Sequence, residues 1–277
     1  MSMIRPPAKW YGGKRYLSSW IISLISNEFK CRHGRDNEHI FVETHGGMGS
    51  VILNKPPCDV EVFNDIDLRM WNLFNELKIN PNKFRRLLTL TPYHQEEFAL
   101  AKLRSDGTGL EAAVAFYTQL RQSFGGAGVG FSFTKHRARK GMADVVSGWL
   151  SSIEENLPLV ISRLVEIQHI KNEDALKVIH DFDSVTTCFY CDPTYLHETR
   201  TSTGEYGAYE MSEADHHLLL TTLQHVRGRF LLSGYHSELY DRIATNNNWS
   251  CHEKKINNHA AGGKTKRIMT EVIWRNF

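Results

Sequence analysis

The chain has 277 residues, 41% of them hydrophobic and 23% charged, and its formal net charge is +2. This composition is typical of a globular protein with one large core and room for a second lobe, and it excludes a disordered or highly charged chain. The sequence contains no apolar run of roughly 18 residues that could span a membrane, and no apolar stretch near its start resembles a secretory signal. We therefore expect a cytoplasmic protein that needs no membrane and no obligate protein partner.

The first third of the sequence predicts alternating helices and strands. Apolar residues at helical spacing predict a helix over residues 14–29. Strands are expected at 40–43 and 60–63, followed by a helix over 68–77. Between the two strands, residues 44–50 form a glycine-rich turn from which a helix is expected to start at Val51. This βαβα order is typical of a nucleotide-binding sheet.

The middle of the chain predicts helices and then a basic surface segment. The expected helices cover 81–90, 94–104 and 110–124. Residues 125–130 form a glycine-dense loop, and the basic run 135–140 follows as an expected surface segment that could contact DNA phosphates. The alternative is a solvated loop, as charge runs usually are. We place a target-recognition domain at 91–165.

The α/β pattern then returns. The expected elements are a helix at 174–182, a strand at 187–191, a helix at 213–226, a strand at 229–233, a helix at 237–244, and extended stretches near 249–256 and 270–274. Such alternation predicts a mostly parallel sheet with helices on both faces. The catalytic domain is expected to comprise residues 1–90 and 166–277.

Cysteine and histidine spacing gives no reason to expect a metal site. The five cysteines are an odd, scattered set, which suits a reducing compartment better than a disulfide framework. Cys188 and Cys191 form a CxxC, but they lie in a predicted strand, where positions i and i+3 point to opposite faces. We expect both in the core, and we expect His216 and His217 on a solvated helix face.

The glycine turn is a candidate cofactor site. Gly47 and Gly49 follow a strand end, where glycine lets the backbone approach a ligand closely, although a tight turn without any ligand explains them equally well. Asp65 ends the next strand and is placed to accept hydrogen bonds from both ribose hydroxyls of an adenosine-containing cofactor. An NAD cofactor would also fit the glycine turn and Asp65, although the full GxGxxG pattern is missing. The alternative role of Asp65 is that of a helix N-cap.

The tetrapeptide Asp192-Pro193-Thr194-Tyr195 follows a buried strand and is suited to methylating an exocyclic amine. Such an amine is a poor nucleophile because its lone pair is delocalised into the ring. The Asp192 carboxylate and the Pro193 carbonyl could accept its two N–H bonds and free the lone pair, while Tyr195 would stack on a flipped-out base. A plain turn explains the isolated tetrapeptide equally well, but the glycine turn and Asp65 favour a functional site.

These segments resemble the Dam-type adenine-N6 DNA methyltransferases, and the resemblance covers most of the chain. Residues 8–14 are similar to that family's N-terminal KWxGGK signature. The other similar segments are 41–51, 64–66, Phe116-Tyr117 with Arg121 and Phe124, 192–195, 199–200, 211–212, 232–235 and 271–274. The resemblance implies an α/β, Rossmann-like S-adenosylmethionine-dependent methyltransferase sheet with an inserted helical DNA-recognition domain. It further implies S-adenosyl-L-methionine as cofactor, double-stranded DNA as partner, and direct methyl transfer to adenine N6 without a metal.

The resemblance also assigns roles to single residues. The implied catalytic residues are Asp192, Pro193 and Tyr195. The residues expected to bind the cofactor are Trp10, Lys14, Glu43, His45, Gly47, Gly49, Asp65, Ile66 and Asp192. The residues expected to contact DNA are Lys9, Arg121, Lys135, Arg137, Arg139 and Lys140.

The sequence departs from the family pattern at several positions. Thr194 replaces the usual second proline, and Thr44-His45 replaces the usual Pro-Phe ahead of the glycines. Leu120 and Gly125 replace asparagines of the recognition region, so a GATC target is not implied. The alternatives are an amino-methyltransferase acting on cytosine N4, RNA or protein, and a DNA-binding relative without turnover. Host regulation, restriction-modification and protection of a phage genome all remain open as biological roles.

Overall fold

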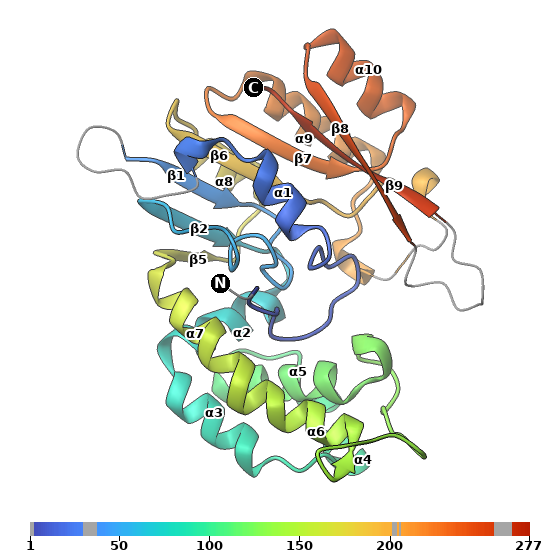
Figure 1. Cartoon of the computed structure of the whole chain (residues 1–277). Helices are drawn as coiled ribbons and strands as arrows, with labels where there is room; N and C mark the ends of the chain where they lie inside the picture. Colours follow the sequence, from blue (N-terminus) through green and yellow to red (C-terminus); the bar gives the residue numbers. More distant parts are fainter. Residues whose placement is uncertain (1–2, 30–37, 201–203, 205, 258–267) are drawn as a thin grey trace.

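The computed structural model describes residues 3–29, 38–200, 204, 206–257 and 268–277. Its main feature is a seven-stranded sheet with the order β5-β2-β1-β6-β7-β9-β8 (Figure 1). The strands are β1 (Ile40–Glu43), β2 (Val60–Asn64), β5 (His169–Lys171), β6 (Thr187–Cys191), β7 (Arg229–Gly234), β8 (Ser250–Asn257) and β9 (Ile268–Arg275). The strands from β5 to β7 pair in parallel, whereas β9 is antiparallel to both β7 and β8. The predicted mostly parallel sheet is confirmed, and its topology is compatible with a Rossmann-like fold.

Helices cover both faces of the sheet because its strands alternate between two apolar sets. On β6, Cys188 and Tyr190 belong to the core that includes α1 (Ser18–Leu24). Phe189 and Cys191 belong to the opposite core. That second core includes α8 (Ala175–Phe182), α9 (Glu213–His225) and α10 (Glu238–Asn246). The two cysteines are fully buried on opposite faces, as predicted, and burial raises the pKa of both thiols.

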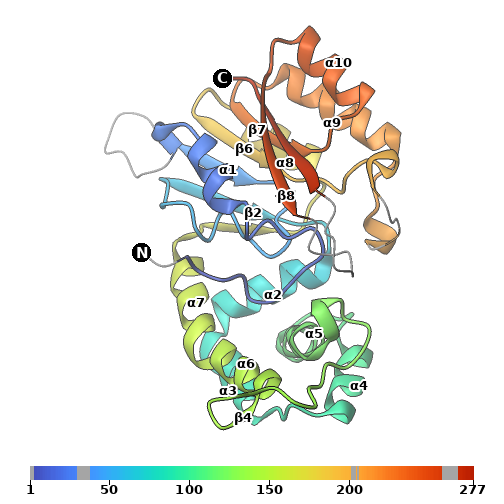
Figure 2. The same cartoon turned by 45° about the vertical axis from the view of Figure 1, so that its right-hand side comes forward.

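A helical lobe lies between β2 and β5 in the sequence. It contains α2 (Leu68–Ile79), α3 (Pro81–Leu90), α4 (Gln95–Arg104), α5 (Leu110–Gln122), α6 (Asp144–Ser151), a π-helical turn (Ser152–Asn156) and α7 (Leu157–Glu166). In Figures 1 and 2, α3 to α6 lie below the sheet, and α2 lies between them and the strands. Phe63 of β2 packs against Phe74 of α2 with ring centroids 4.4 Å apart, so one apolar core continues from the sheet into the lobe.

Three predictions about local structure are wrong. The helix expected over 14–29 is shortened to α1 and a 3₁₀ turn (Asn27–Phe29), because the backbone at Ile25 is extended. Consecutive turns replace the helix expected at 51–53. The basic segment 135–140 is exposed, as predicted, and part of it belongs to a hairpin of β3 (Ala138–Arg139) and β4 (Met142–Ala143).

The third error concerns His216, which is fully buried rather than solvated. His216 continues the inward stripe of α9 that is formed by Leu219, Leu220 and Leu223. Its Nδ1 lies 2.8 Å from the hydroxyl of Tyr240 on α10.

Among the described residues, no helix is both long and apolar enough to cross a membrane.

A buried ion cluster connects the sheet to the helical lobe. Glu61 of β2 pairs with Lys55 at 2.9 Å and accepts a hydrogen bond of 2.7 Å from Nη2 of Arg163 on α7. The side chains of Lys55 and Glu61 are fully buried, and that of Arg163 is 7% exposed. Two cations therefore share one carboxylate in a region of low polarity, where an ion without a partner is strongly unfavourable.

We expect Glu61→Ala to lower the free energy of unfolding by about 3–5 kcal/mol, because Lys55 and Arg163 would remain buried without their carboxylate. Urea denaturation of the wild type and the variant measures this difference. The matched control is Glu155→Ala, which removes the exposed partner of Lys140 and should change the stability little. Equal losses in the two variants would contradict the role given to Glu61.

Candidate functional site

The strand order of the sheet defines where a ligand is expected to bind. From β1 the sheet continues through β2 to β5 in one direction, and through β6 to β7 in the other. Open α/β sheets bind ligands outside the carboxyl ends of the strands at such a switch point. Glu43 of β1 is paired with Tyr190 of β6, so the two strands end side by side. The glycine turn and the tetrapeptide, which are far apart in the sequence, therefore meet at this point.

The glycine turn needs glycine at more than one position. Gly47 and Gly49 have φ values of 50° and 66°, in the left-handed region that favours glycine. A Cβ at Gly46 would lie 2.2 Å from Cε2 of Phe63, so no side chain fits there. Gly46 was not among the predicted site residues, because its packing against the next strand leaves no local sequence signal. A Cβ at Gly47 would lie 3.6 Å from Cδ1 of Trp10, which brings the predicted cofactor residue Trp10 against the turn.

Asp65 connects the end of β2 to the glycine turn. Its Oδ2 accepts a hydrogen bond of 2.6 Å from the Gly47 amide, and its Oδ1 accepts one of 2.8 Å from the Asp67 amide. Asp67 is the residue that caps α2, through a hydrogen bond of 2.9 Å from the Arg69 amide, so the alternative role of Asp65 as the N-cap is wrong. Burial raises the pKa of Asp65 to about 6. The neighbouring Ile66 is 47% exposed beside this carboxylate.

Glu43 and His45 make hydrogen bonds within the glycine turn and the residues that flank it. The Glu43 carboxylate is buried and accepts a hydrogen bond of 2.7 Å from the Ile52 amide. Burial raises the pKa of Glu43 well above its usual range, and the charges of Asp192 and Asp65 raise it further. Nδ1 of His45 lies 2.8 Å from the Thr44 hydroxyl. Burial lowers the pKa of His45 to about 4, so a neutral imidazole follows β1 at neutral pH.

Four side chains from three distant segments form a polar cluster at the end of β6. Lys14 Nζ lies 2.8 Å from Asp192 Oδ1 and 3.8 Å from Glu271 Oε1 on β9. The Tyr195 hydroxyl donates its hydrogen bond to Glu271 and lies 3.4 Å from Asp192 Oδ1. Lys14 Nζ also lies 4.7 Å from the centroid of the Tyr195 ring. The predicted residues Lys14, Asp192 and Tyr195 are thus in direct contact.

Glu271 was predicted only as part of a similar segment and not as a member of the site. Its position becomes evident only when β9 is paired antiparallel to β7, which brings it to the edge where β6 ends. A lone glutamate in a strand pattern carries no local signal for such a contact. The structure therefore adds Glu271 to the site.

Burial and opposite charges control ionisation in this cluster. Burial favours a lower pKa for Lys14, but the carboxylates of Asp192 and Glu271 outweigh it and hold that pKa above the usual range. Burial raises the pKa of Asp192, and the charge of Lys14 opposes this effect. Burial also raises the pKa of Glu271 to about 7, although the positive charge of Lys14 favours a lower value. Asp192 thus depends on Lys14 for the stability of its charged form.

The other two residues of the tetrapeptide are structural neighbours of the cluster. Pro193 is buried. Thr194, which stands where the resembling family has proline, accepts a hydrogen bond of 3.0 Å from the Met211 amide through its Oγ1. This hydrogen bond holds the segment that precedes α9 against the tetrapeptide. The Tyr195 ring meets Tyr235 edge to face, with centroids 4.8 Å apart.

Two of the predicted DNA contacts lie where the N-terminal segment meets the helical lobe. Lys9 and Arg121 line a cavity of about 180 Å³ together with Gly126 and Gly148. Nη2 of Arg121 donates a hydrogen bond of 2.9 Å to the Gly148 carbonyl. A Cβ at Gly126 would lie 2.5 Å from Cβ of Lys9, so the glycine-dense loop packs tightly against the segment that carries Trp10.

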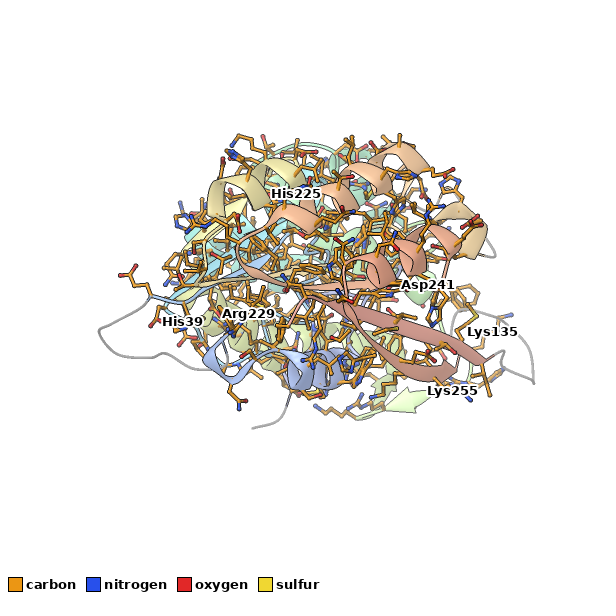
Figure 3. All side chains as sticks on the ribbon, turned by 90° about the horizontal axis from the view of Figure 1, so that it is seen from above. His39, Lys135, His225, Arg229, Asp241 and Lys255 are labelled. Atoms are coloured by element: carbon orange, nitrogen blue, oxygen red, sulfur yellow. The ribbon has the colours of Figure 1, made fainter. Side chains whose placement is uncertain are left out.

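The remaining predicted DNA contacts lie on the β3–β4 hairpin or just before it. Lys135, Arg137, Arg139 and Lys140 are all exposed. Figure 3 shows Lys135 at the edge of the molecule. Lys140 pairs with Glu155 at 2.9 Å, whereas the hairpin residue Arg139 is exposed on β3. The structure thus divides the predicted DNA contacts into a pair beside the glycine-dense loop and a basic group on or just before the hairpin.

Neither a protein-family model nor a curated protein sequence matches this chain. A functional assignment therefore depends on the geometry of the site and on the resemblance of its motifs.

The raised pKa of Glu271 predicts a pH-dependent effect of Glu271→Gln. A carboxyl group with a folded-state pKa of about 7, against an ordinary value of 4.5, stabilises the fold below pH 4.5, and this contribution is lost as the pH rises through 7. The glutamine variant cannot ionise, so its stability relative to the wild type should increase between pH 4.5 and pH 8, by up to about 3 kcal/mol. Urea denaturation at several pH values measures this, and a constant difference would contradict the pKa assignment.

Proposed function

We propose that this protein is an S-adenosyl-L-methionine-dependent methyltransferase that methylates the N6 amino group of adenine in double-stranded DNA. The proposal rests mainly on one observation. The glycine turn after β1 and the tetrapeptide after β6 lie side by side at the switch point of the sheet. This arrangement allows a cofactor and an amine substrate to meet at Asp192. The resemblance to Dam-type enzymes favours the same reaction, and the protein would act in the cytoplasm of a bacterial or phage-infected cell.

The residues around the glycine turn fit the proposed cofactor. Each Asp65 oxygen accepts one backbone N–H and retains a lone pair, so the carboxylate can also accept hydrogen bonds from two ribose hydroxyls. The exposed Ile66 offers an apolar surface for the adenine ring, and Trp10 borders the turn at Gly47. Such a cofactor would supply an electrophilic methyl group on a positively charged sulfur. We assign its binding to these residues together with Lys14, Glu43, His45, Gly49 and Asp192.

The chemistry assigned to the chain is to make the adenine amine nucleophilic. The Asp192 carboxylate and the Pro193 carbonyl would each accept one N–H of the amine and hold its lone pair out of the ring. Lys14 contacts Oδ1 of Asp192 at 2.8 Å and supports the charged form that this role requires. Formation of the new N–C bond would break the bond between the methyl carbon and the sulfur, and its electron pair would stay on the sulfur. The amine must then lose one proton, and the Asp192 carboxylate is the acceptor that we assign to it.

Tyr195 is proposed to stack on the flipped-out base. Its hydroxyl is held by Glu271 and Asp192, and its ring lies against Tyr235 and beneath the Lys14 ammonium. A ring held at several points needs little further ordering when a base arrives. Because Glu271 contacts Tyr195 and Lys14, we assign it a positioning role.

We expect Asp192→Ala to lower the rate of radiolabelled methyl transfer from S-adenosylmethionine into duplex DNA by about 10²–10⁴-fold, because the amine would lose its acceptor. The control Asp181→Ala changes a half-exposed carboxylate on α8 and should leave the rate unchanged. Equal labelling by the wild type and Asp192→Ala would contradict the role of Asp192. Label found only in RNA, in protein or at cytosine would favour the alternative acceptors. Absence of any label with the wild type would favour a relative without turnover.

The β3–β4 hairpin is proposed to contact DNA phosphates. In a titration of duplex DNA at several salt concentrations, the double variant Arg137→Ala/Arg139→Ala should bind more weakly than the wild type. The slope of log affinity against log salt should fall by roughly 0.9 for each phosphate that the variant no longer neutralises. The control Arg242→Ala removes an exposed charge from α10, at the opposite end of the molecule in Figure 1, and should leave the slope unchanged. An unchanged slope in the hairpin variant would exclude the hairpin from the interface.

A further inference from the structure

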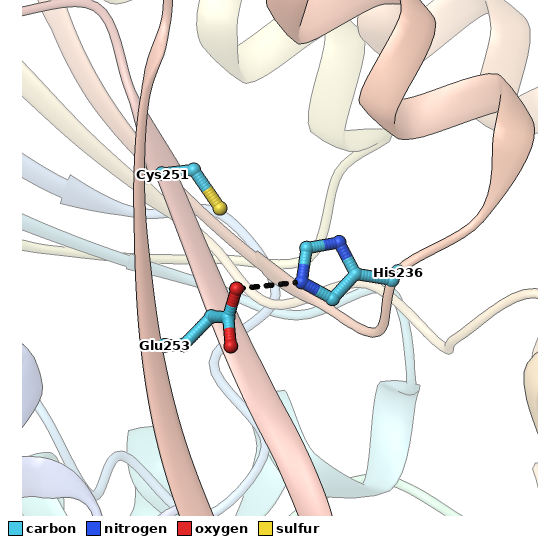
Figure 4. A group of neighbouring side chains, drawn as sticks. All are labelled: His236, Cys251 and Glu253. Atoms are coloured by element: carbon cyan, nitrogen blue, oxygen red, sulfur yellow. Dashed lines mark hydrogen bonds and ion pairs between the residues drawn. The ribbon is translucent and has the colours of Figure 1, made fainter.

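A second group of chemically reactive side chains lies away from the proposed catalytic site. His236 follows β7, and Cys251 and Glu253 lie on the edge strand β8 (Figure 4). One ligand atom from each of the three residues lies within 4.8 Å of the other two. All three side chains are exposed, so an ion from solvent can reach them.

The sheet register explains why these side chains converge. Cys251 and Glu253 are two positions apart on β8, so they point to the same face of the sheet. They are paired with Trp274 and Val272, which belong to the core shared with α9 and α10. The His236 ring also contacts Trp274, with centroids 6.0 Å apart.

The register also separates this group from the proposed catalytic cluster. Glu271 is paired with Lys254, which follows Glu253 on β8. Because successive side chains of a strand alternate between faces, Glu271 points to the opposite face from Val272. The two groups are thus divided by the thickness of the sheet.

The His236 ring is already oriented as a metal ligand would be. Its Nδ1 lies 2.8 Å and 3.0 Å from the two carboxylate oxygens of Asp241 on α10. A hydrogen bond from Nδ1–H to a carboxylate leaves the Nε2 lone pair for coordination, which is the usual outer-shell arrangement of metal-binding histidines. Nε2 faces Glu253, with 3.2 Å between Nε2 and Oε1.

The distances in this group suit a small tetrahedral ion. Metal–ligand bonds of about 2.0–2.3 Å at tetrahedral angles place neighbouring ligand atoms about 3.3–3.5 Å apart. The separation of 3.2 Å between His236 Nε2 and Glu253 Oε1 is close to this spacing, and the Cys251 sulfur lies within 4.8 Å of a ligand atom of each of these two residues. An ion pair between a protonated His236 and Glu253 would also explain their contact, but it gives no role to the neighbouring thiol.

We propose that His236, Cys251 and Glu253 form a zinc-binding site, with Asp241 as the residue that orients His236. Imidazole, thiolate and carboxylate together match the ligand preference of Zn²⁺, whereas Mg²⁺ and Ca²⁺ prefer oxygen ligands alone. The bound ion would link the edge strand β8 to the connection between β7 and α10. Sequence spacing gave no reason to expect a metal, because the ligands come from two segments that only the folded sheet brings together.

Cobalt substitution tests the proposal on the full-length protein. We expect one Zn²⁺ per chain by native mass spectrometry, and Co²⁺ to give a near-ultraviolet thiolate charge-transfer band together with the visible bands of a tetrahedral site. Cys251→Ser should abolish the thiolate band, and His236→Ala should abolish tight binding. Asp241→Asn should weaken binding by about 10- to 100-fold, as expected for loss of an outer-shell partner. Zn²⁺ should raise the midpoint of thermal unfolding of the wild type but not of Cys251→Ser.

Matched controls identify the residues that hold the ion. Cys31→Ser removes a different cysteine, at a position outside the described residues, and His180→Ala removes an exposed histidine of α8. Both control variants should bind Zn²⁺ as the wild type does. The proposal is overturned by absence of Zn²⁺ binding, by a cobalt thiolate band that survives in Cys251→Ser, or by a band that is lost in Cys31→Ser. None of these measurements depends on methyl transfer, so they test this site separately from the proposed activity.

Discussion

The ion pair between Lys14 and Asp192 is the interaction on which the candidate site depends. Asp192 follows a strand whose residues are all buried, and burial opposes its negative charge. Lys14 lies 2.8 Å away and supplies the opposite charge that offsets this effect. The same ammonium group contacts Glu271 and the face of Tyr195, so a single cation organises the groups proposed to act on the substrate. Lys14 therefore contributes both to the ionisation of the site and to the geometry of the site.

The sequence predicts those parts of the site that follow from the geometry of single strands. A strand that ends in glycines and a strand that ends in an aspartate each give a local pattern, and parallel pairing brings such ends to one edge of a sheet. Gly47, Asp65 and Asp192 could be selected on this basis. Lys14 is predicted only by the resemblance of its segment to a family signature, and the structure brings it into contact with Asp192.

The parts that the sequence did not predict depend on contacts across the sheet. Glu271 reaches the site through the antiparallel strand β9, and Gly46 is required because of Phe63 on the neighbouring strand. Glu61 is a charged residue in a buried strand, and its two cations come from a turn and from α7. His216 replaces an apolar residue in a helical stripe. The position of His216 could have been predicted, because it lies at helical spacing from Leu219, Leu220 and Leu223. For the other residues the deciding partner is distant in the sequence, so local motifs contain no trace of it.

The segment from Lys9 to Lys14 provides a physical link between the proposed activities of the two lobes. Lys9 packs against Gly126 of the glycine-dense loop, Trp10 borders Gly47, and Lys14 contacts Asp192. Trp10 also meets Phe116 of α5 edge to face, with centroids 6.1 Å apart. The glycine-dense loop, the glycine turn and the polar cluster are thus all contacted by residues of one short segment. The segment therefore joins the helical lobe to the polar cluster, through packing at Lys9 and Trp10 and through the ion pair at Lys14.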